Sequence, residues 1–261
     1  MEPYVLHYAP DNASLCVRLA LEELNLPYST ALVDRPAQAH RSPAYLALNP
    51  NGLIPVLETP QGAVFETAAI LLWLADVHQA LAPAPQDPAR AHFLKWLFFL
   101  SNTLHPALRR RFQPEKYICS DQPMQRALQD DTRRQIADCL DTLERATDLP
   151  APFSVFDCYL CPMLRWAKIY PTDTTNDWFD LQHFPRLLER AQMCEPRASV
   201  QSAAQAEGLG PAPFSNPHLP STPIGSATRC FFLYLICSRS VLAPRPRIRW
   251  AQWWRLRSFS T

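Results

Sequence analysis

The chain has 261 residues, of which 48% are hydrophobic and 11% are aromatic, and its formal net charge is +1. A chain of this length can bury a large core, and the aromatic content argues for a packed globular protein rather than a disordered one. All 24 acidic residues lie at or before Glu207, so residues 1–207 carry a net charge of −6 (18 basic minus 24 acidic), whereas the last seven arginines lie in residues 229–261. An acidic body argues against nucleic acid as the main partner.

The N-terminus and the cysteines indicate the compartment. The first residues, MEPYVLHYAPDNA, lack a basic segment followed by an apolar one, so we expect no signal peptide and a cytoplasmic location. The longest apolar run, residues 230–237, is far shorter than the roughly 20 residues that span a bilayer. The eight cysteines are then expected to be reduced thiols. Cys158 and Cys161 form a single C-x-x-C pair without a second one, which favours a structural role and no metal site.

The first 80 residues alternate apolar runs with helical patterns. Residues 4–8 and 29–33 are predicted to be strands, and residues 13–24, with leucines at helical spacing, a helix. Two strands joined by a helix predict a βαβ unit with parallel strands and a right-handed crossover. A loop with a short helix at 43–48, a β-hairpin at 54–65 and a helix at about 67–77 complete the order βαβ-ββα.

Residues 49–74 contain two features that could bind a small peptide. Pro55 stands at the front of a short strand, where proline cannot donate to the ladder, and a cis bond after Ile54 is one physical solution. The residue before such a proline exposes its backbone on a strand edge, where an extended peptide could pair. Glu66 and Thr67 open the next helix, whose free N–H groups could bind a carboxylate.

The rest of the chain reads as helices. After a proline-rich linker at 80–88, apolar residues recur at helical spacing in 89–112, 124–146 and 154–169, and two short helices are expected at 184–193 and 196–206. Ser154 and Asp157 have the spacing of an N-terminal capping box. Residues 208–228 form a proline-rich coil expected to lie along the body. Residues 229–261 read as an appended extension, or as a patch for weak contact with an anionic membrane surface or an acidic partner.

Four motifs in this order resemble the glutathione S-transferase superfamily over about residues 3–215. They are YVLHYAP with LCVRLALEELNLPY, then NPNGLIPVLE with the cis-proline of that family, FETAAILLWLAD with its glutamate–serine/threonine motif, and SVFDCYL with its capping box. The resemblance implies an α/β thioredoxin-like glutathione-binding domain at 1–80, an all-α helical domain at 89–207, and a coil and basic tail of uncertain status at 208–261. It also implies a cytoplasmic homodimer that joins glutathione to small hydrophobic electrophiles without a metal.

The resemblance assigns the parts of glutathione to named residues. Ile54, before the architectural Pro55, would pair its backbone with the cysteinyl part of glutathione. Thr67 and the N–H groups of its helix would hold the γ-glutamyl carboxylate, and Glu66 its ammonium through charge-assisted hydrogen bonds. Asn51 would lie near the glycyl end.

Two residues with hydroxyl groups are candidates for the donor that acts on the sulfur. YAPDNASL resembles the Y-S-P-G-A-C-S-L loop of the bacterial beta-like classes, but Ala13 stands at the cysteine position, which argues against chemistry through a mixed disulfide with the protein. Ser14, at the start of the first helix, could donate to the thiolate, or it could be a plain N-cap. Tyr8, at the end of the first strand, is the alternative donor, or a core aromatic residue.

The segment SNTLHPALRRRF resembles the beta-like segment whose histidine reaches the glutathione site, here His105, although a structural histidine is the competing reading. Three arginines follow at 109–111; they are basic enough for an anion site, but consecutive residues cannot share one helix face, so a solvated surface is favoured. The electrophile pocket is expected between the domains. Helical phase suggests that its lining includes Phe98, Leu104, Leu108 and Phe112.

Two other functions fit the same pattern. Two features favour a non-catalytic glutathione-binding or interaction protein that has kept the fold. One is the absence of the beta-class cysteine at Ala13, and the other is the tail at 229–261, which has no counterpart in the family. A glutathione-dependent isomerase, dehalogenase or peroxidase would use the same thiolate on another substrate.

Overall fold

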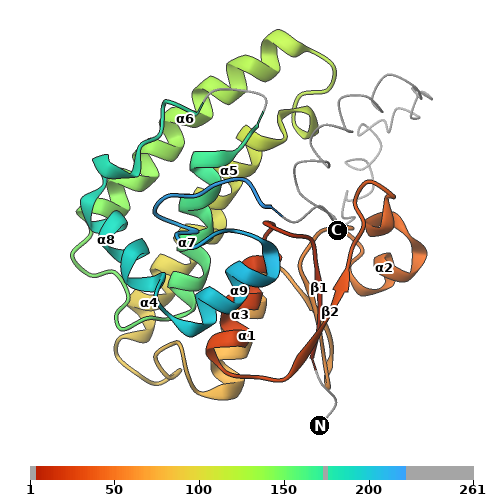
Figure 1. The fold of residues 1–261 in the computed structure, drawn as a ribbon, viewed down its shortest axis with the longest axis vertical. Helices are drawn as coiled ribbons and strands as arrows, with labels where there is room; N and C mark the ends of the chain where they lie inside the picture. Colours follow the sequence, from red (N-terminus) through yellow and green to blue (C-terminus); the bar gives the residue numbers. More distant parts are fainter. Residues whose placement is uncertain (1–3, 173–175, 222–261) are drawn as a thin grey trace, which may run out of the picture.

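A computed structural model of the chain describes residues 4–172 and 176–221, so the expectations for the tail at 229–261 lie outside the described residues. A four-stranded mixed sheet has the order β2-β1-β3-β4 (Figure 1). Its strands are β1 (Tyr4–Tyr8), β2 (Tyr28–Leu32), β3 (Val56–Thr59) and β4 (Gly62–Phe65). β1 runs parallel to β2 and antiparallel to β3, and β4 is antiparallel to β3. The predicted βαβ-ββα order is confirmed.

Helices cover the sheet on both faces, because successive residues of a strand point to opposite faces and bury apolar side chains on each. On one face lie α1 (Ser14–Glu23) and α3 (Thr67–His78), which pack on Leu6 and Leu57 in the main core. On the other face the short segments η1 (Ala39–Arg41) and α2 (Pro43–Leu48) cover a small cluster of Val33, Tyr45 and Val56. The loop between β1 and α1 and the turn before β3 connect the sheet to these helices, and both contribute residues to the cavity described below.

The turn before β3 is built around a cis peptide bond between Ile54 and Pro55, which confirms that prediction. The carbonyl of Leu53 accepts hydrogen bonds from Asn49 Nδ2 (2.9 Å) and from the Tyr45 hydroxyl (2.8 Å), so the chain just before the bend is fixed. Gly52 has a φ of +61°, and a Cβ there would lie 2.7 Å from the carbonyl oxygen of His40. Only glycine fits this position, and it brings η1 against the turn.

The helical part begins with α4 (Arg90–Phe99), a π-helical segment η2 (Leu100–Leu104) and α5 (His105–Phe112). The predicted helix over 89–112 is therefore confirmed, except that residues 100–104 are π-helical. Pro106 has no N–H to donate to the preceding turn, and a local π-helical segment accommodates the missing bond. The remaining helices are α6 (Gln122–Arg145), α7 (Val155–Ile169), α8 (Pro185–Cys194) and α9 (Ala198–Glu207), with short 3₁₀ turns η3 (Pro114–Lys116) and η4 (Leu181–His183).

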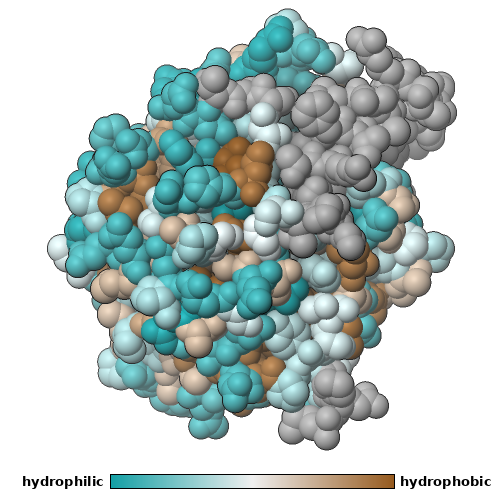
Figure 2. All heavy atoms as spheres, viewed as in Figure 1, coloured by the Kyte–Doolittle hydropathy of each residue, from teal (hydrophilic) through white to brown (hydrophobic). Residues whose placement is uncertain are grey.

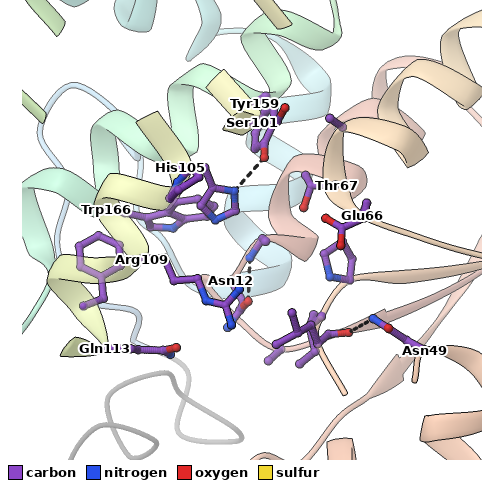
Figure 3. Close-up of a pocket in the computed structure, with 18 of the residues that line it drawn as sticks. Asn12, Asn49, Glu66, Thr67, Ser101, His105, Arg109, Gln113, Tyr159 and Trp166 are labelled. Carbon is purple, nitrogen blue, oxygen red and sulfur yellow. Dashed lines mark hydrogen bonds between the residues drawn. The ribbon is translucent and has the colours of Figure 1, made fainter. Parts of the chain in front are cut away.

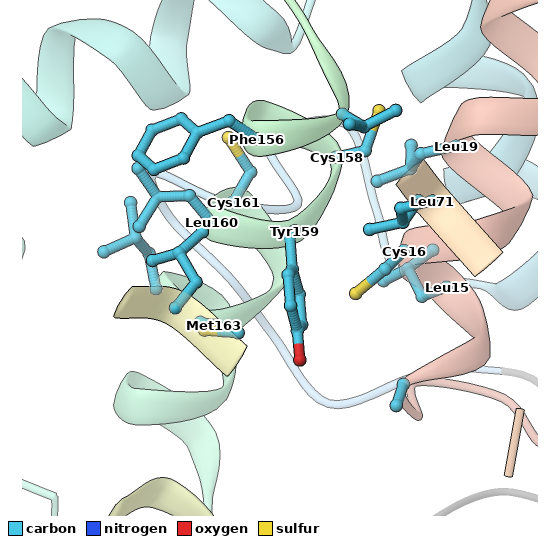
Figure 4. Close-up of a cluster of buried hydrophobic side chains, with 14 of the residues drawn as sticks. Leu15, Cys16, Leu19, Leu71, Phe156, Cys158, Tyr159, Leu160, Cys161 and Met163 are labelled. Carbon is cyan, nitrogen blue, oxygen red and sulfur yellow. The ribbon is translucent and has the colours of Figure 1, made fainter. Parts of the chain in front are cut away.

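α7 lies at the centre of the molecule and begins with the predicted capping box between Ser154 and Asp157. It packs directly against α1, and Figure 4 shows Cys158 and Tyr159 facing Cys16 on α1. Cys158 and Cys161 are buried in this core, as expected for structural residues. Burial raises the pKa of the Cys158 thiol, and a hydrogen bond with Cys194 together with burial raises the pKa of Cys161. Among residues 4–172 and 176–221 no group of three or more His, Cys, Asp or Glu side chains is placed to hold a metal ion.

The coil that follows α9 lies along the body as far as the structure describes it, to Ser221. Leu209 and Phe214 are buried, and the Glu195 carboxylate accepts hydrogen bonds from the backbone N–H groups of Phe214 and Ser215. On the face drawn in Figure 2, hydrophilic residues cover most of the surface and apolar ones form small scattered patches. No helix within the described part is both long and apolar enough to cross a membrane.

Candidate active site

A cavity of about 690 Å³ lies between the sheet-containing part and the helical part. One wall is made by the loop between β1 and α1, the turn before β3, and the N-terminus of α3. The facing wall is made by α4, η2, α5 and α7 (Figure 3). Both predicted peptide-binding features thus open into one cavity.

Ile54, Pro55, Glu66 and Thr67 all line this cavity. Glu66 has a φ of +74°, a conformation that non-glycine residues rarely adopt and that is often found at functional sites. Thr67 is buried at the N-terminus of α3, where no side chain caps the helix. The first N–H groups of α3 are therefore available to an anion in the cavity.

Asn51 does not reach the cavity. Its side chain is exposed, and its backbone N–H donates to Asn49 Oδ1 at 3.0 Å in the tight turn. Asn49, one of the lining residues, is buried and holds the carbonyl of Leu53. The predicted role for Asn51 at the glycyl end is thus not supported by its position, because the positive φ of Gly52 turns the chain away there.

Neither hydroxyl proposed as thiolate donor lines the cavity. Ser14 is fully buried, and its Oγ both donates to the carbonyl of Ala9 (3.1 Å) and accepts from the N–H of Ala9 (3.3 Å). This local pairing ties the loop to α1 and turns the hydroxyl away. Tyr8 has the Arg18 guanidinium 4.9 Å from its ring centre.

Asn12 and Ala13 occupy the place on the cavity wall that we had expected Ser14 to take. Asn12 Oδ1 accepts a hydrogen bond from the Ala13 N–H at 2.8 Å, and Figure 3 shows the side chain at the floor of the cavity. No residue in the described ranges accepts from Asn12 Nδ2. This amide is not predicted from the sequence, although DNAS places a donor one residue from the beta-like cysteine position.

His105 and Tyr159 form a buried pair on the helical wall. His105 Nδ1 lies 2.8 Å from the Tyr159 hydroxyl, which also interacts with the side chain of Thr67. Burial, together with the charge of Arg109, lowers the pKa of His105 to about 4, so its imidazole is neutral at pH 7. Burial raises the pKa of Tyr159 well above its usual value, so its hydroxyl keeps its proton. Because the ring of Trp166 packs 5.8 Å from that of His105, the imidazole is fixed in place.

The three arginines of α5 have three different environments, so the prediction of one solvated surface is wrong. Arg109 lines the cavity. Arg110 donates to Gln135 on α6 at 2.7 Å, and Arg111 is fully buried, with its guanidinium 4.9 Å from the ring centre of Trp178. A helix turns about 100° per residue, so consecutive side chains point in different directions.

The apolar lining was predicted in part. Phe98 and Phe112 line the cavity, whereas Leu104 and Leu108 do not. Both leucines are buried in the main core instead, because the π-helical segment changes the helical phase that the prediction assumed. Tyr170, from the end of α7, adds a further aromatic side chain to the lining.

The comparisons with known proteins agree with this geometry. The family model for the glutathione S-transferase N-terminal domain matches residues 13–77. The glutathione S-transferase GST-4.5 of Xanthomonas campestris is 31% identical over 215 residues, covering 78% of this chain and 98% of that protein. A maleylacetoacetate isomerase of Rhizobium meliloti is 32% identical over 106 residues, which are 40% of this chain and 50% of that protein.

Among solved structures, a glutathione transferase homologue from Sulfitobacter with bound glutathione superposes with a TM-score of 0.68 at 26% identity. The match covers 79% of this chain and 99% of that one. The chain belongs to the glutathione S-transferase family.

Proposed function

We propose that this protein is a glutathione transferase that binds glutathione in the cavity and activates its thiol for attack on small electrophiles. The observation that carries the proposal is that the cis-proline edge at Ile54 and the free N-terminus of α3 open into the same cavity. Glutathione would pair its cysteinyl backbone with Ile54. Its γ-glutamyl carboxylate would lie at Thr67 and its ammonium at Glu66.

In this arrangement the sulfur would face Asn12 and the N-terminus of α1. The thiol is mostly protonated at neutral pH, and only the thiolate is a competent nucleophile. A donated hydrogen bond from Asn12 Nδ2 and the positive end of α1 would both favour the thiolate, and the proton would pass to solvent. The new carbon–sulfur bond forms as the electrophile loses its leaving group or takes up a proton.

Glutathione would supply the reacting thiol by itself. None of the lining residues within the described ranges is a cysteine, and Cys16 on α1 is fully buried. We therefore propose direct conjugation, without a mixed disulfide between glutathione and the protein. Mass spectrometry after incubation with glutathione disulfide checks this step. An added glutathionyl mass on a variant with Cys119, Cys230 and Cys237 replaced by serine, which keeps only the buried thiols of the described residues, would contradict it.

The experiment that tests the proposed function is the conjugation of glutathione to 1-chloro-2,4-dinitrobenzene by the full chain. We expect saturable turnover above the uncatalysed rate, abolished when glutathione is replaced by its S-methyl derivative. A matched control replaces Thr59, which lies in the β3–β4 hairpin outside the cavity, by alanine. Turnover that survives without a free glutathione thiol would contradict the proposal.

A glutathione-dependent isomerase is a second candidate, because the chain is similar to part of a maleylacetoacetate isomerase. In an isomerase the thiolate adds to the substrate and leaves again, so glutathione is not consumed. Measuring free thiol during turnover separates the two functions. A cytoplasmic homodimer is part of our proposal, and light scattering of the purified chain tests the assembly state.

A further inference from the structure

A group of basic side chains surrounds one end of the cavity. Arg35, His40 and Arg41 come from the loop and η1 on the sheet side, and Arg109 and Lys116 come from α5 and η3 on the helical side. Gly52 allows the close approach of η1, because the position that a Cβ would take there is 3.3 Å from Arg41 Nη1. The two walls therefore bring their cations to the same opening.

These cations have little opposite charge near them. Within the described part of the chain, Arg35, Arg41, Arg109 and Lys116 form no ion pair with a carboxylate. Of the acidic residues, Asp11 and Glu66 line the cavity, and Glu115 adjoins Lys116. Asp11 is already paired with Arg165. Cations held together without counter-charges repel one another, and an anion between them would relieve that cost.

The protonation of the group agrees with this geometry. Removal from water and the charges of Arg35, Arg41 and Lys116 lower the pKa of His40 to about 4. Partial removal from water and the charges of Arg35, Arg109 and Arg41 lower the pKa of Lys116 to about 8, an effect that Glu115 opposes. His40 is therefore neutral at pH 7, and its Nδ1 is buried without a hydrogen-bond partner among the described residues. Lys116 stays mostly charged.

Glutathione accounts for only part of this positive charge. It carries two carboxylates and one ammonium, and in the proposed pose the γ-glutamyl end lies at Glu66 and Thr67. Its glycyl carboxylate is the one remaining carboxylate, and it would lie beyond Ile54, toward Arg35 and Arg41 on the same wall, while the thiolate would lie at Asn12. Arg109 and Lys116, on the helical wall that receives the electrophile, then have no carboxylate from glutathione. Figure 3 shows Arg109 pointing into the cavity on the side of Asn12.

We propose that the second substrate is an electrophile that carries a carboxylate, which Arg109 and Lys116 hold while its reactive carbon faces the sulfur. This inference rests on the proposed function. Arg109 lies one helical turn after His105, so it is placed to bind the anion while the aromatic body of the electrophile packs on Phe98 and Phe112. The guanidinium can bind a carboxylate through two parallel hydrogen bonds, and the ammonium adds a second charge.

The test compares two electrophiles with the same reacting carbon and leaving group but different charge, 4-chloro-3,5-dinitrobenzoate and its methyl ester. In both, the glutathione thiolate adds to the carbon that bears chlorine, chloride leaves with its electron pair, and the thiol proton goes to solvent. Each kcat/KM is divided by the uncatalysed rate with glutathione, so that intrinsic reactivity cancels. We expect the full chain to favour the carboxylate, and this preference to fall as salt is added.

The variants are Arg109→Gln and Lys116→Gln, with Arg110→Gln as the matched control, since Arg110 is on the same helix but bonds Gln135 outside the cavity. Arg109→Gln should lower the normalised kcat/KM for the carboxylate about tenfold while changing that for the ester less than about threefold. Lys116→Gln should act in the same direction with a smaller change. Arg110→Gln should change neither value.

Glutathione binding, measured by calorimetry on the same proteins, keeps the two proposals apart. Unchanged glutathione affinity in Arg109→Gln supports the assignment, and a tenfold loss would overturn it, because the cation would then serve glutathione. Equal normalised rates for the two electrophiles in the unaltered chain would also overturn it. If neither of these electrophiles nor 1-chloro-2,4-dinitrobenzene reacts, the proposed function fails. Calorimetric binding of the carboxylate then still decides the anion site, which is overturned if the ester binds equally well.

Discussion

Asp11 and Arg165 form a two-pronged ion pair that is completely buried. Arg165 Nε donates to Asp11 Oδ1 and Arg165 Nη2 donates to Oδ2, both at 2.9 Å, and neither side chain is exposed to solvent. Trp166 Nε1 and the Tyr170 hydroxyl donate to the same carboxylate at 2.9 and 2.8 Å. Asp11 lies in the loop that forms the cavity floor, so side chains of α7 fix the position of this loop through the Asp11 carboxylate.

The other side of the same loop is held by a buried carboxyl group, whose pKa is raised to about 7 by burial, an effect that Arg18 opposes. Glu207 accepts hydrogen bonds from the Asp11 N–H (2.7 Å) and from Arg18 Nε (2.8 Å), and it is fully buried. Asp11 itself has a φ of +50°. The ion pair with Arg165 and the backbone hydrogen bond to Glu207 therefore keep this strained residue, and with it Asn12 and Ala13, in one conformation.

We predict that Asp11→Asn lowers the free energy of unfolding by about 3–5 kcal/mol, because it leaves Arg165 buried without its counter-charge. Urea denaturation measures this change. The control is Asp130→Asn, which breaks an exposed ion pair with Arg133 on α6 and should cost about 0–1 kcal/mol. Equal effects of the two substitutions would show that the buried pair contributes no more than an exposed one.

Thr67→Val should weaken glutathione binding about tenfold or more, because it removes a hydrogen-bond donor to the γ-glutamyl carboxylate while keeping the shape of the side chain. Isothermal titration calorimetry measures the dissociation constant. Thr59→Val in the β3–β4 hairpin is the control and should bind glutathione like the unaltered chain. Should Thr67→Val bind normally, the carboxylate does not lie at the α3 N-terminus.

Asn12→Ala should lower kcat/KM for conjugation about tenfold to hundredfold, since a hydrogen bond to a developing thiolate is lost. Ser14→Ala should act mainly on stability, because its hydroxyl is paired with the backbone of Ala9, and Tyr8→Phe should change turnover little. The measurement is the pH dependence of kcat/KM, which reports the pKa of the bound thiol. Only the Asn12 variant is expected to raise that pKa, and a rise with Ser14→Ala or Tyr8→Phe would restore the hydroxyl as donor.

His105 should stay neutral over the whole range from pH 5 to pH 8, because burial, with the charge of Arg109, lowers its pKa to about 4. The unfolded chain has an ordinary histidine that titrates near 6.5. Between these two values the unfolded state binds the extra proton, so this residue makes the fold less stable as the pH falls from about 6.5 to 4. Proton NMR of the imidazole, assigned with His105→Gln, measures the pKa, and titration near 6.5 would contradict the buried pairing with Tyr159.

Much of the fold could be predicted from the sequence where a feature depends on neighbours in the chain. The cis bond at Ile54-Pro55 follows from a proline at the front of a strand, and the capping box of α7 from the spacing of Ser154 and Asp157. The position of Thr67 on the cavity wall follows from its place at the start of a predicted helix. Each of these needed only residues within a few positions of one another.

Features that depend on tertiary packing could not be predicted in this way. The Asp11–Arg165 pair joins residues 154 positions apart, and no local pattern indicates it. The π-helical segment before Pro106 shifted the phase of the helix, which moved Leu104 and Leu108 out of the predicted pocket lining. The sequence predicts Ser14 as a thiolate donor because hydroxyls suit thiolates, but its hydroxyl already donates a hydrogen bond to the carbonyl of Ala9.

The most direct test of the account is a crystal structure of the full chain with glutathione. We predict that the cysteinyl backbone pairs with the backbone of Ile54, that the γ-glutamyl carboxylate lies at the N–H groups of α3 beside Thr67, and that the sulfur lies within hydrogen-bond distance of Asn12 Nδ2. Glutathione bound away from the Ile54 edge, or no glutathione there at a saturating concentration, would contradict the central claim.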